Sequence, residues 1–429
     1  MNSDFEFAKT RRFAPLFCTQ FLGAFNDNLF KTTLFVLISF YGLGKNEVLP
    51  AAQMLNVGAL LFVLPYFLFS ALSGQLSTRY DKAKIAKSVK ILEVLIMVLA
   101  GYGFFASCPP ILMLCLFLMG THSTLFGPVK YAILPEYLQE KELLMGNGLI
   151  ESGTFLAILF GQILGTSIAG HNPWVLSGMV LLVAVLGLVS SLFMPATPAK
   201  NPNSHIDWHI GRNTKNLMKQ TKKQPELYTA VIGISWFWFV GSVYTTQLST
   251  FVQKHLNGNA SVFNLMLSLF SIGIAAGSVL CAKISKGQLR LKLVTLGAIG
   301  LTIFGGLLVF FAHSKHYDGN SLQGLISFLS QSTAYPVIIA MLGIGFFGGF
   351  FSVPLYTWLQ TAADDEFRAH AIAANNIMNA VFMVSAAIIS VILLAMFDSI
   401  LLLYGVVALG NISLLIYLGK RAPQLFFSK

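Results

Sequence analysis

Long apolar runs separated by short polar segments recur along the whole chain. Each run has roughly 20 residues or more, the length that an α-helix needs to cross the hydrocarbon core of a bilayer. The runs are continuously apolar, whereas the strands of a membrane barrel are about ten residues of alternating polarity. We therefore predict an all-α, polytopic membrane protein with twelve transmembrane helices, near residues 13–41, 51–78, 85–106, 110–133, 142–170, 173–194, 225–252, 261–284, 291–312, 333–358, 368–396 and 398–419.

The composition supports this class of protein, and the placement of charge indicates its topology. Only 10% of the 429 residues are charged, compared with about 25% in a soluble domain. The formal net charge is +11, and most Lys and Arg, including a group at 79–90, fall on the cytoplasmic side if the N-terminus is inside. Lys45, Lys254 and Lys315 fall outside, and Lys31 lies within the membrane. Positive-inside topology explains this excess better than nucleic-acid binding, so we expect both termini in the cytoplasm; the basic stretches could also attract anionic lipid headgroups.

A polar stretch near the middle of the chain divides the predicted helices into two sets of six. The halves share a pattern between their fourth and fifth helices: FGPVKYAILPEYL precedes GNGLIES in the first half, and FSVPLYTWLQ precedes ANNIMNA in the second. Parallel six-helix repeats imply a substrate site between the halves that opens to each side in turn. We predict an N-terminal six-helix bundle at 1–195, a cytoplasmic linker at 196–224 and a C-terminal six-helix bundle at 225–429.

The first predicted helix holds charged and amide side chains within an otherwise apolar run, FLGAFNDNLFK at 21–31. Asp27 lies about 14 residues, or roughly 21 Å, beyond the first apolar residue, so its carboxylate cannot reach water by snorkelling. A charge at that depth costs at least ~2.5 kcal/mol and needs a cavity or a partner. Gln20, Asp27 and Lys31 share one helical face, with Asn26 beside them. Two interpretations remain open: a face toward a substrate or gate, or an internal Asp27–Lys31 pair that fixes helix packing.

Further polar residues lie on the fourth, fifth and eleventh predicted helices. Asn147 and Glu151 lie one helical turn apart, and the glycines that follow permit close approach of a neighbouring helix. Glu151 either lines a cavity or forms an interhelical pair, and Lys130 either contacts an anion or snorkels toward the cytoplasm. The C-terminal half has no deep charge; it offers Asn375 and Asn379 and is rich in aromatic residues. A charged wall facing an apolar wall would suit an amphiphile.

Motifs of several well-known enzyme classes are absent from the sequence. None of GxxxxGK[ST], HExxH and GxSxG occurs, so nothing indicates ATP hydrolysis, zinc proteolysis or an α/β-hydrolase. The eight histidines and four cysteines show no spacing typical of metal ligands or of a disulfide framework. We expect no enzyme activity, no metal and no cofactor.

Several segments resemble a known family. The pattern of helices resembles the major facilitator superfamily, and GQLSTRYDKAK at 74–84 is similar to its loop between helices 2 and 3, with Ala83 in place of the second glycine. That similarity implies a conformational role for Gly74, Arg79, Asp81 and Lys82. More specifically, AFNDNLFK, FGPVKYAILPEYL and GNGLIESGTFLAILFG resemble the bacterial lysophospholipid transporter family.

The resemblance implies a flippase of the bacterial inner membrane. Such a protein moves lysophospholipids, for example lysophosphatidylethanolamine, from the outer to the inner leaflet for reacylation by alternating access. Asp27, Lys130 and Glu151 match the family's acidic residue of helix 1, lysine of helix 4 and glutamate of helix 5, whereas Asn26 stands where the family often has glycine. We expect a monomer, coupled functionally to a separate acyltransferase and acyl-carrier-protein synthetase. The alternative is a proton-coupled major facilitator transporter of another small molecule, with Asp27 or Glu151 as proton carrier.

Overall fold

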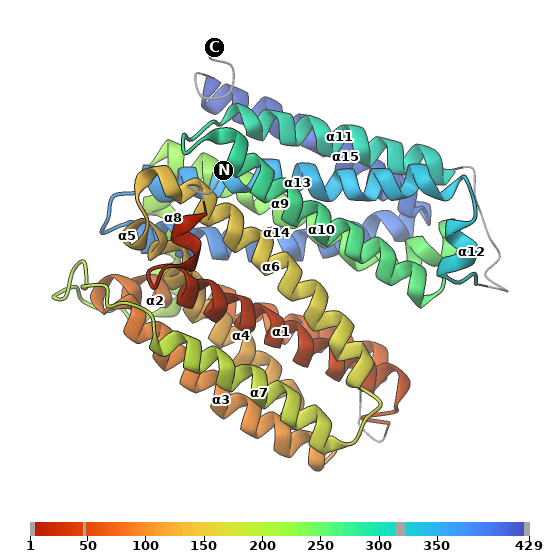
Figure 1. Cartoon of the computed structure of the whole chain (residues 1–429), viewed down its shortest axis with the longest axis horizontal. Helices are drawn as coiled ribbons and strands as arrows, with labels where there is room; N and C mark the ends of the chain where they lie inside the picture. The colour runs from red at the N-terminus through yellow and green to blue at the C-terminus, as the bar shows by residue number, and fades with distance from the viewer. Residues whose placement is uncertain (1–4, 46–48, 314–321, 424–429) are drawn as a thin grey trace. The chain divides into compact units, whose positions relative to one another are not determined.

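The computed structural model describes residues 5–45, 49–313 and 322–423, and these are almost entirely helical (Figure 1). Lys315 and both chain ends, for which the sequence predicts a side of the membrane, lie outside the described residues. Within the described ranges there is no strand, only an isolated bridge between Gly258 and Gln323. The elements are η1 (Glu6–Lys9), α1 (Ala14–Phe40), α2 (Ala51–Arg79), α3 (Lys82–Phe105), α4 (Pro109–Ala132), α5 (Leu134–Tyr137), α6 (Glu140–Ile168), α7 (Pro173–Leu192), α8 (Ile210–Lys222), α9 (Pro225–Leu256), α10 (Ala260–Ser285), α11 (Lys292–His313), α12 (Leu325–Leu329), α13 (Ala334–Ala362), α14 (Arg368–Phe397) and α15 (Ile400–Arg421).

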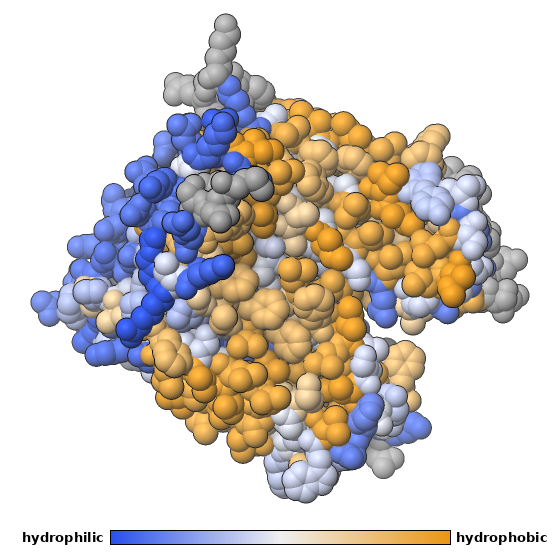
Figure 2. Space-filling model, viewed as in Figure 1, coloured by the Kyte–Doolittle hydropathy of each residue, from blue (hydrophilic) through white to orange (hydrophobic). Residues whose placement is uncertain are grey.

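Eleven helices in the described part of the chain are long and apolar enough to cross a membrane, which confirms the all-α, polytopic class. The remaining predicted span, 13–41, forms the 27-residue helix α1, which carries the polar segment around Asp27 and is not among the eleven. On the face shown in Figure 2, hydrophobic residues form broad surfaces and hydrophilic residues gather toward the ends. This is the surface expected of a protein whose middle lies in hydrocarbon.

One local prediction is wrong. The sequence placed Lys90 in a cytoplasmic group of basic residues at 79–90, but α3 already begins at Lys82. Lys90 lies two turns into this helix, where its side chain is fully buried and paired with Glu93. Its charge therefore has a partner inside the protein and says nothing about topology.

The chain forms two compact units. Unit 1 consists of Met1–Gly146, Leu156–Gln224 and Gln360–Ile377, and unit 2 of Asn147–Phe155, Pro225–Leu359 and Met378–Lys429. The first turns of α14 thus belong with unit 1, and a short part of α6 belongs with unit 2. The segment 196–224, predicted as a linker, lies in unit 1 and contains α8, which packs on α2.

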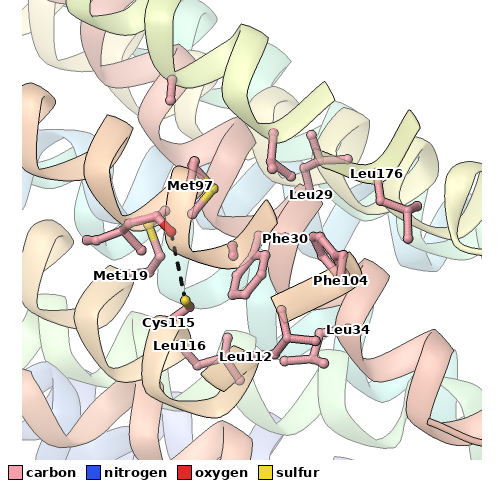
Figure 3. Close-up of a cluster of buried hydrophobic side chains, with 14 of the residues drawn as sticks. Leu29, Phe30, Leu34, Met97, Phe104, Leu112, Cys115, Leu116, Met119 and Leu176 are labelled. Atoms are coloured by element: carbon pink, nitrogen blue, oxygen red, sulfur yellow. Dashed lines mark hydrogen bonds between the residues drawn. The ribbon is translucent and has the colours of Figure 1, made fainter. Parts of the chain in front are cut away.

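The core of unit 1 is built from the apolar faces of α1, α3, α4 and α7 (Figure 3). Phe30 of α1 meets Phe104 of α3 edge-on, with 5.9 Å between ring centroids. The glycines of α6 let that helix approach α1 closely: a Cβ at Gly161 would lie 3.1 Å from the Cβ of Asn28, and one at Gly165 would lie 2.8 Å from the Leu29 carbonyl oxygen. The close approach predicted from these glycines is confirmed, and it fixes α1 at the depth where its polar segment lies.

Unit 2 uses glycine in the same way where α10 meets α13. A Cβ at Gly277 would overlap the backbone of Phe346, and one at Gly345 would overlap the carbonyl of Phe270. On another side of this unit, α9 packs on α15, where the indole of Trp236 donates to the side-chain oxygen of Asn411 at 2.8 Å. Side chains larger than hydrogen are excluded from the α10–α13 contact, so its helices are held by backbone-to-backbone packing.

Candidate functional site

A buried carboxylate at the centre of unit 1 organises three helices. Glu93 of α3 accepts from the side-chain amide of Asn26 on α1 at 2.8 Å and from the Lys90 ammonium at 2.6 Å. The Nε2 atom of His122 on α4 lies 3.2 Å from the same carboxylate. Asn26, Lys90 and Glu93 are fully buried and His122 nearly so. An amide and an ammonium therefore donate to one carboxylate, with an imidazole beside it, which is how a protein keeps an ionised group away from water.

The next residue of α1 faces a different partner. Asp27 is largely buried, and its Oδ2 atom accepts a hydrogen bond from the Ser123 hydroxyl of α4. Two pairs of neighbouring residues are thus split between two sites. Asn26 and His122 lie against Glu93, whereas the residues that follow them, Asp27 and Ser123, contact each other.

Asp27 and Lys31 have separate surroundings in the structure. In the described residues no ion pair joins these side chains; the Lys31 ammonium instead lies over the Phe62 ring, 5.0 Å from its centroid. Glu93 is matched by Lys90, whereas Asp27 keeps one buried oxygen, Oδ1, without a hydrogen-bond partner. A carboxylate with an unused acceptor can bind a cationic or hydrogen-donating group. The Asp27–Lys31 ion pair, one of the two interpretations of the sequence, is not formed in the described residues.

The other predicted residues of unit 1 lie apart from this pair. Gln20 is buried on α1, two turns before Asp27. Lys130 is half-buried in the last turn of α4, with its ammonium 4.8 Å from the Tyr131 ring centroid. Asn375 of α14 is buried, and neither polar atom of its side-chain amide has a hydrogen-bond partner among the described residues. Lys130 and Asn375 thus remain candidates on different elements of this unit.

Three predicted residues belong to unit 2. The amide of Asn147 donates to the Thr357 hydroxyl of α13 at 3.1 Å, and Glu151 is buried one turn further along α6. Asn379 of α14 accepts from the Ser235 hydroxyl of α9 at 2.9 Å. Asn147 and Asn379 already have protein partners, so both contribute to packing between helices of this unit.

Aromatic rings line the same part of unit 2. Phe155 of α6 lies against Phe237 and Trp238 of α9, with centroids 5.9 and 6.1 Å apart. Trp238 is only half-buried, and its indole donates to the Tyr356 hydroxyl at 2.9 Å. This group of rings forms a largely buried apolar cluster next to Glu151, which is four residues before Phe155 on α6.

The segment 74–84, predicted as a loop, is the end of α2 and the start of α3 with only two residues between them, and its side chains hold parts of unit 1 together. Asp81 caps α3 by accepting from the backbone of Ala83 at 2.8 Å, and it also accepts from the Thr197 hydroxyl at 3.1 Å. The ammonium of Lys82 is buried 2.7 Å from Glu136. One carboxylate therefore begins α3 and also holds the chain that follows α7.

The remaining two residues of this segment contact other parts of unit 1. Arg79 donates to the Ser204 carbonyl at 3.1 Å. A Cβ at Gly74 would lie 3.0 Å from the Cβ of Ala373 on α14, so this position needs glycine for close packing. Arg79 and Gly74 thus tie the end of α2 to the chain that follows α7 and to α14.

Sequence reasoning missed Lys90, Glu93, His122 and Ser123. Lys90 and Glu93 are three residues apart in a long apolar run, and that spacing could have identified them as a buried pair. His122 and Ser123 gave no such signal, because one histidine in an apolar helix acquires meaning only from the carboxylate opposite it. Asn26 and Asp27 were predicted correctly as buried polar residues, and their partners were not.

A helical bundle that holds titratable side chains within its membrane-spanning helices is typical of a membrane transporter. The chain belongs to the major facilitator superfamily, whose model matches residues 16–386. The lysophospholipid transporter LplT of Cronobacter sakazakii is 29% identical over 381 residues, which cover 86% of this chain and 85% of that protein. The protein of the same name from Escherichia coli is 27% identical over 368 residues, covering 83% and 82%.

Solved structures of two other transporters have the same fold. The human organic anion transporter MFSD10 (TETRAN) superposes with a TM-score of 0.71 at 14% identity, covering 94% of this chain and 99% of that one. FucP, a major facilitator transporter in the outward conformation, superposes with a TM-score of 0.68 at 13% identity, covering 95% and 98%. At these identities the likeness establishes the fold alone. Together with the family match, it makes this chain a multi-pass membrane protein of a transporter family.

Proposed function

We propose that this protein is a lysophospholipid transporter that moves lysophospholipids such as lysophosphatidylethanolamine from the outer to the inner leaflet of a bacterial inner membrane. The observation that carries the proposal is the similarity to proteins named lysophospholipid transporter, which extends over more than four-fifths of both chains. The motif around Asp27 lies within the matched family region, and in the structure this carboxylate has an unused acceptor. A polar headgroup crossing a bilayer needs such a group to replace water.

The residues suggest a division of labour in binding. Asp27 or Glu151 would meet the ammonium of an ethanolamine headgroup, and Lys130 would attract its phosphate. The half-buried Trp238 and the rings packed against it in unit 2 would supply the apolar contacts that a single acyl chain requires. Gln20, Lys31 and Asn375 are the further polar groups that we propose to contact the substrate or a gate. Alternating access would then expose the headgroup to each leaflet in turn.

The remaining parts of the proposal concern the setting of the protein. We propose that 1–195 and 225–429 act as two six-helix bundles joined by 196–224, with both termini in the cytoplasm. The protein would act as a monomer and would not itself catalyse reacylation. A separate acyltransferase and acyl-carrier-protein synthetase would consume the delivered lysophospholipid, because reacylation removes the substrate from the inner leaflet and makes transport directional.

A proton-coupled transporter of another small molecule is the second candidate. The observation in its favour is the buried Asp27 carboxylate, whose Oδ1 atom has no hydrogen-bond partner among the described residues. Asp27 or Glu151 would take up a proton on one side of the membrane and release it on the other.

The deciding experiment measures lysophosphatidylethanolamine flipping in proteoliposomes, with and without a proton gradient. We expect flipping by the wild type without a gradient and a large loss in Asp27→Asn, which preserves shape and removes charge. Asp398→Asn is the matched control, because it removes the same charge from an exposed site. Absence of flipping by a folded wild type would contradict the proposed function, and flipping only with a proton gradient would favour proton coupling. Wild-type flipping by Asp27→Asn would contradict the role of Asp27 alone.

A further inference from the structure

Helix α8 has one face that is packed and one that is not. Leu217 joins a buried cluster with Ala71 of α2 and with Ala373, Ala374 and Ile377 of α14, all within unit 1. The Gln75 side chain of α2 fastens the helix by donating to Asn213 at 2.8 Å and accepting from the backbone of Asp207 at 2.9 Å. These contacts hold α8 in a fixed orientation.

The residues of α2 that contact α8 lie within its last turns, so α8 lies beside a membrane span. Helix α2 ends at Arg79, and Ala71 lies two turns, about 12 Å, before that end. Helix α8 therefore lies along the flank of the last turns of α2 and not beyond its end. The polar layer between hydrocarbon and water is only about 5–8 Å thick on each side of a bilayer. A helix at this level has lipid headgroups within reach of its outer side chains.

The outer face of α8 is basic. Arg212, Lys215, Lys219, Lys222 and Lys223 are all exposed, and their spacing of three, four, three and one puts them on one side of the helix, opposite Leu217. Asp207 pairs with Arg212 at 2.8 Å, and no ion pair engages the four lysines within the part of the chain that the structure describes. This leaves a stripe of four uncompensated positive charges.

One large exposed apolar side chain lies at the N-terminal end of this stripe. Trp208, two residues before α8 begins, is 70% exposed. Tryptophan prefers the boundary between headgroups and hydrocarbon, and lysines beside an exposed apolar end are typical of helices that lie on a lipid surface. An acidic protein partner would explain the lysines but not the exposed tryptophan.

We propose that the outer face of α8, formed by the basic residues from Arg212 to Lys223, binds the anionic phospholipid headgroups of the adjacent leaflet together with the exposed Trp208 that precedes the helix. Each basic residue near an anionic surface adds roughly fivefold to the attraction. The same helix bridges α2 and the first turns of α14, so its lipid contacts bear on elements that belong to unit 1. This binding is separate from substrate transport and holds whatever the substrate is.

The test compares hydrogen exchange of the α8 backbone in full-length protein reconstituted in two kinds of nanodisc. One contains phosphatidylcholine alone, and the other contains about one-third phosphatidylglycerol. We expect exchange across 210–222 to slow about tenfold in the anionic nanodisc, and high salt to reverse the change. The variant with Lys215, Lys219, Lys222 and Lys223 all replaced by Gln should lose the difference. Its packed face is untouched, so its melting temperature should remain that of the wild type.

The matched control removes four exposed basic residues elsewhere, at Lys283, Lys286, Arg290 and Lys292 in unit 2. This variant should retain the slowing of α8 exchange. Equal exchange of α8 in both nanodiscs would overturn the proposal. An acidic protein partner would then be the better explanation of the basic face. Slowing that survives in the four-lysine variant would also overturn the proposal. Neither outcome involves a transport assay, so neither affects the proposed function.

Discussion

Replacing Lys90 alone should damage the protein far more than replacing Lys90 and Glu93 together. The Lys90 ammonium lies 2.6 Å from the Glu93 carboxylate, and both side chains are inaccessible to solvent. Lys90→Met keeps most of the side-chain volume but leaves a buried carboxylate with only Asn26 and His122 as partners. Leaving one buried charge without its counterion costs about 3–5 kcal/mol. Replacing both partners by neutral residues of similar volume is often neutral or slightly stabilising.

The measurement is a double-mutant cycle of Lys90→Met, Glu93→Gln and the double variant, followed by thermal unfolding in detergent and by the yield of monodisperse protein. We expect each single variant to lose several degrees of melting temperature and the double variant to recover most of the loss. Lys87→Met is the control, because Lys87 lies one turn earlier on α3, is half-buried and has no ion pair in the described residues. It should melt like the wild type. Additive losses in the double variant, or a silent Lys90→Met, would refute the electrostatic coupling of this cluster.

Three further predictions concern local structure. Asp81→Ala should lower stability by about 1–2 kcal/mol, because it removes the cap of α3, and thermal unfolding measures the loss. Gly277→Ala should disturb the α10–α13 contact and cost about 1–3 kcal/mol, whereas Gly306→Ala, where a Cβ meets nothing within 4 Å, should be tolerated; equal behaviour in a melting assay would contradict the packing. The hydrogen bond from Arg368 lowers the pKa of Asp365 below its usual 3.8, so this pair stabilises the protein above that pH and is lost as pH falls through the lowered pKa. Asp365→Asn should reduce the stability lost at acid pH, by less than about 1 kcal/mol of unfolding free energy because the carboxylate is mostly exposed. Melting temperatures measured against pH give this change, and the same acid-induced loss in the variant as in the wild type would contradict the assignment.

The helices were predictable from sequence because a membrane span must satisfy its backbone internally and is apolar over about 20 residues. Even α1 was found, although its polar segment lowers its hydropathy, because the apolar residues on both sides of Asp27 are continuous. The close approach of α6 to a neighbouring helix was also predictable, because glycines at helical spacing have few other uses in a membrane; the structure shows that the neighbour is α1.

The partners of the polar residues could not be predicted in the same way. Hydropathy shows that Asp27 is costly to bury, but it does not show that Ser123 faces it, because that contact joins residues 96 positions apart. Lys90 was assigned to the cytoplasm because it follows four other basic residues, and only the depth of Glu93 shows otherwise. The packed side of α8 likewise depends on Ala71 and Ile377, which are distant in the chain.

The division of Asn26 and Asp27 between two partners has a mechanical consequence for α1. Successive residues of an α-helix point about 100° apart, and here one is tied to Glu93 on α3 while the next is tied to Ser123 on α4. Turning α1 in either direction would break both ties at once, and sliding it would bring the pairs out of step. We therefore expect α1 to move together with α3 and α4 as one rigid group. Rotation of α1 alone would not be the motion that carries a bound ion or headgroup.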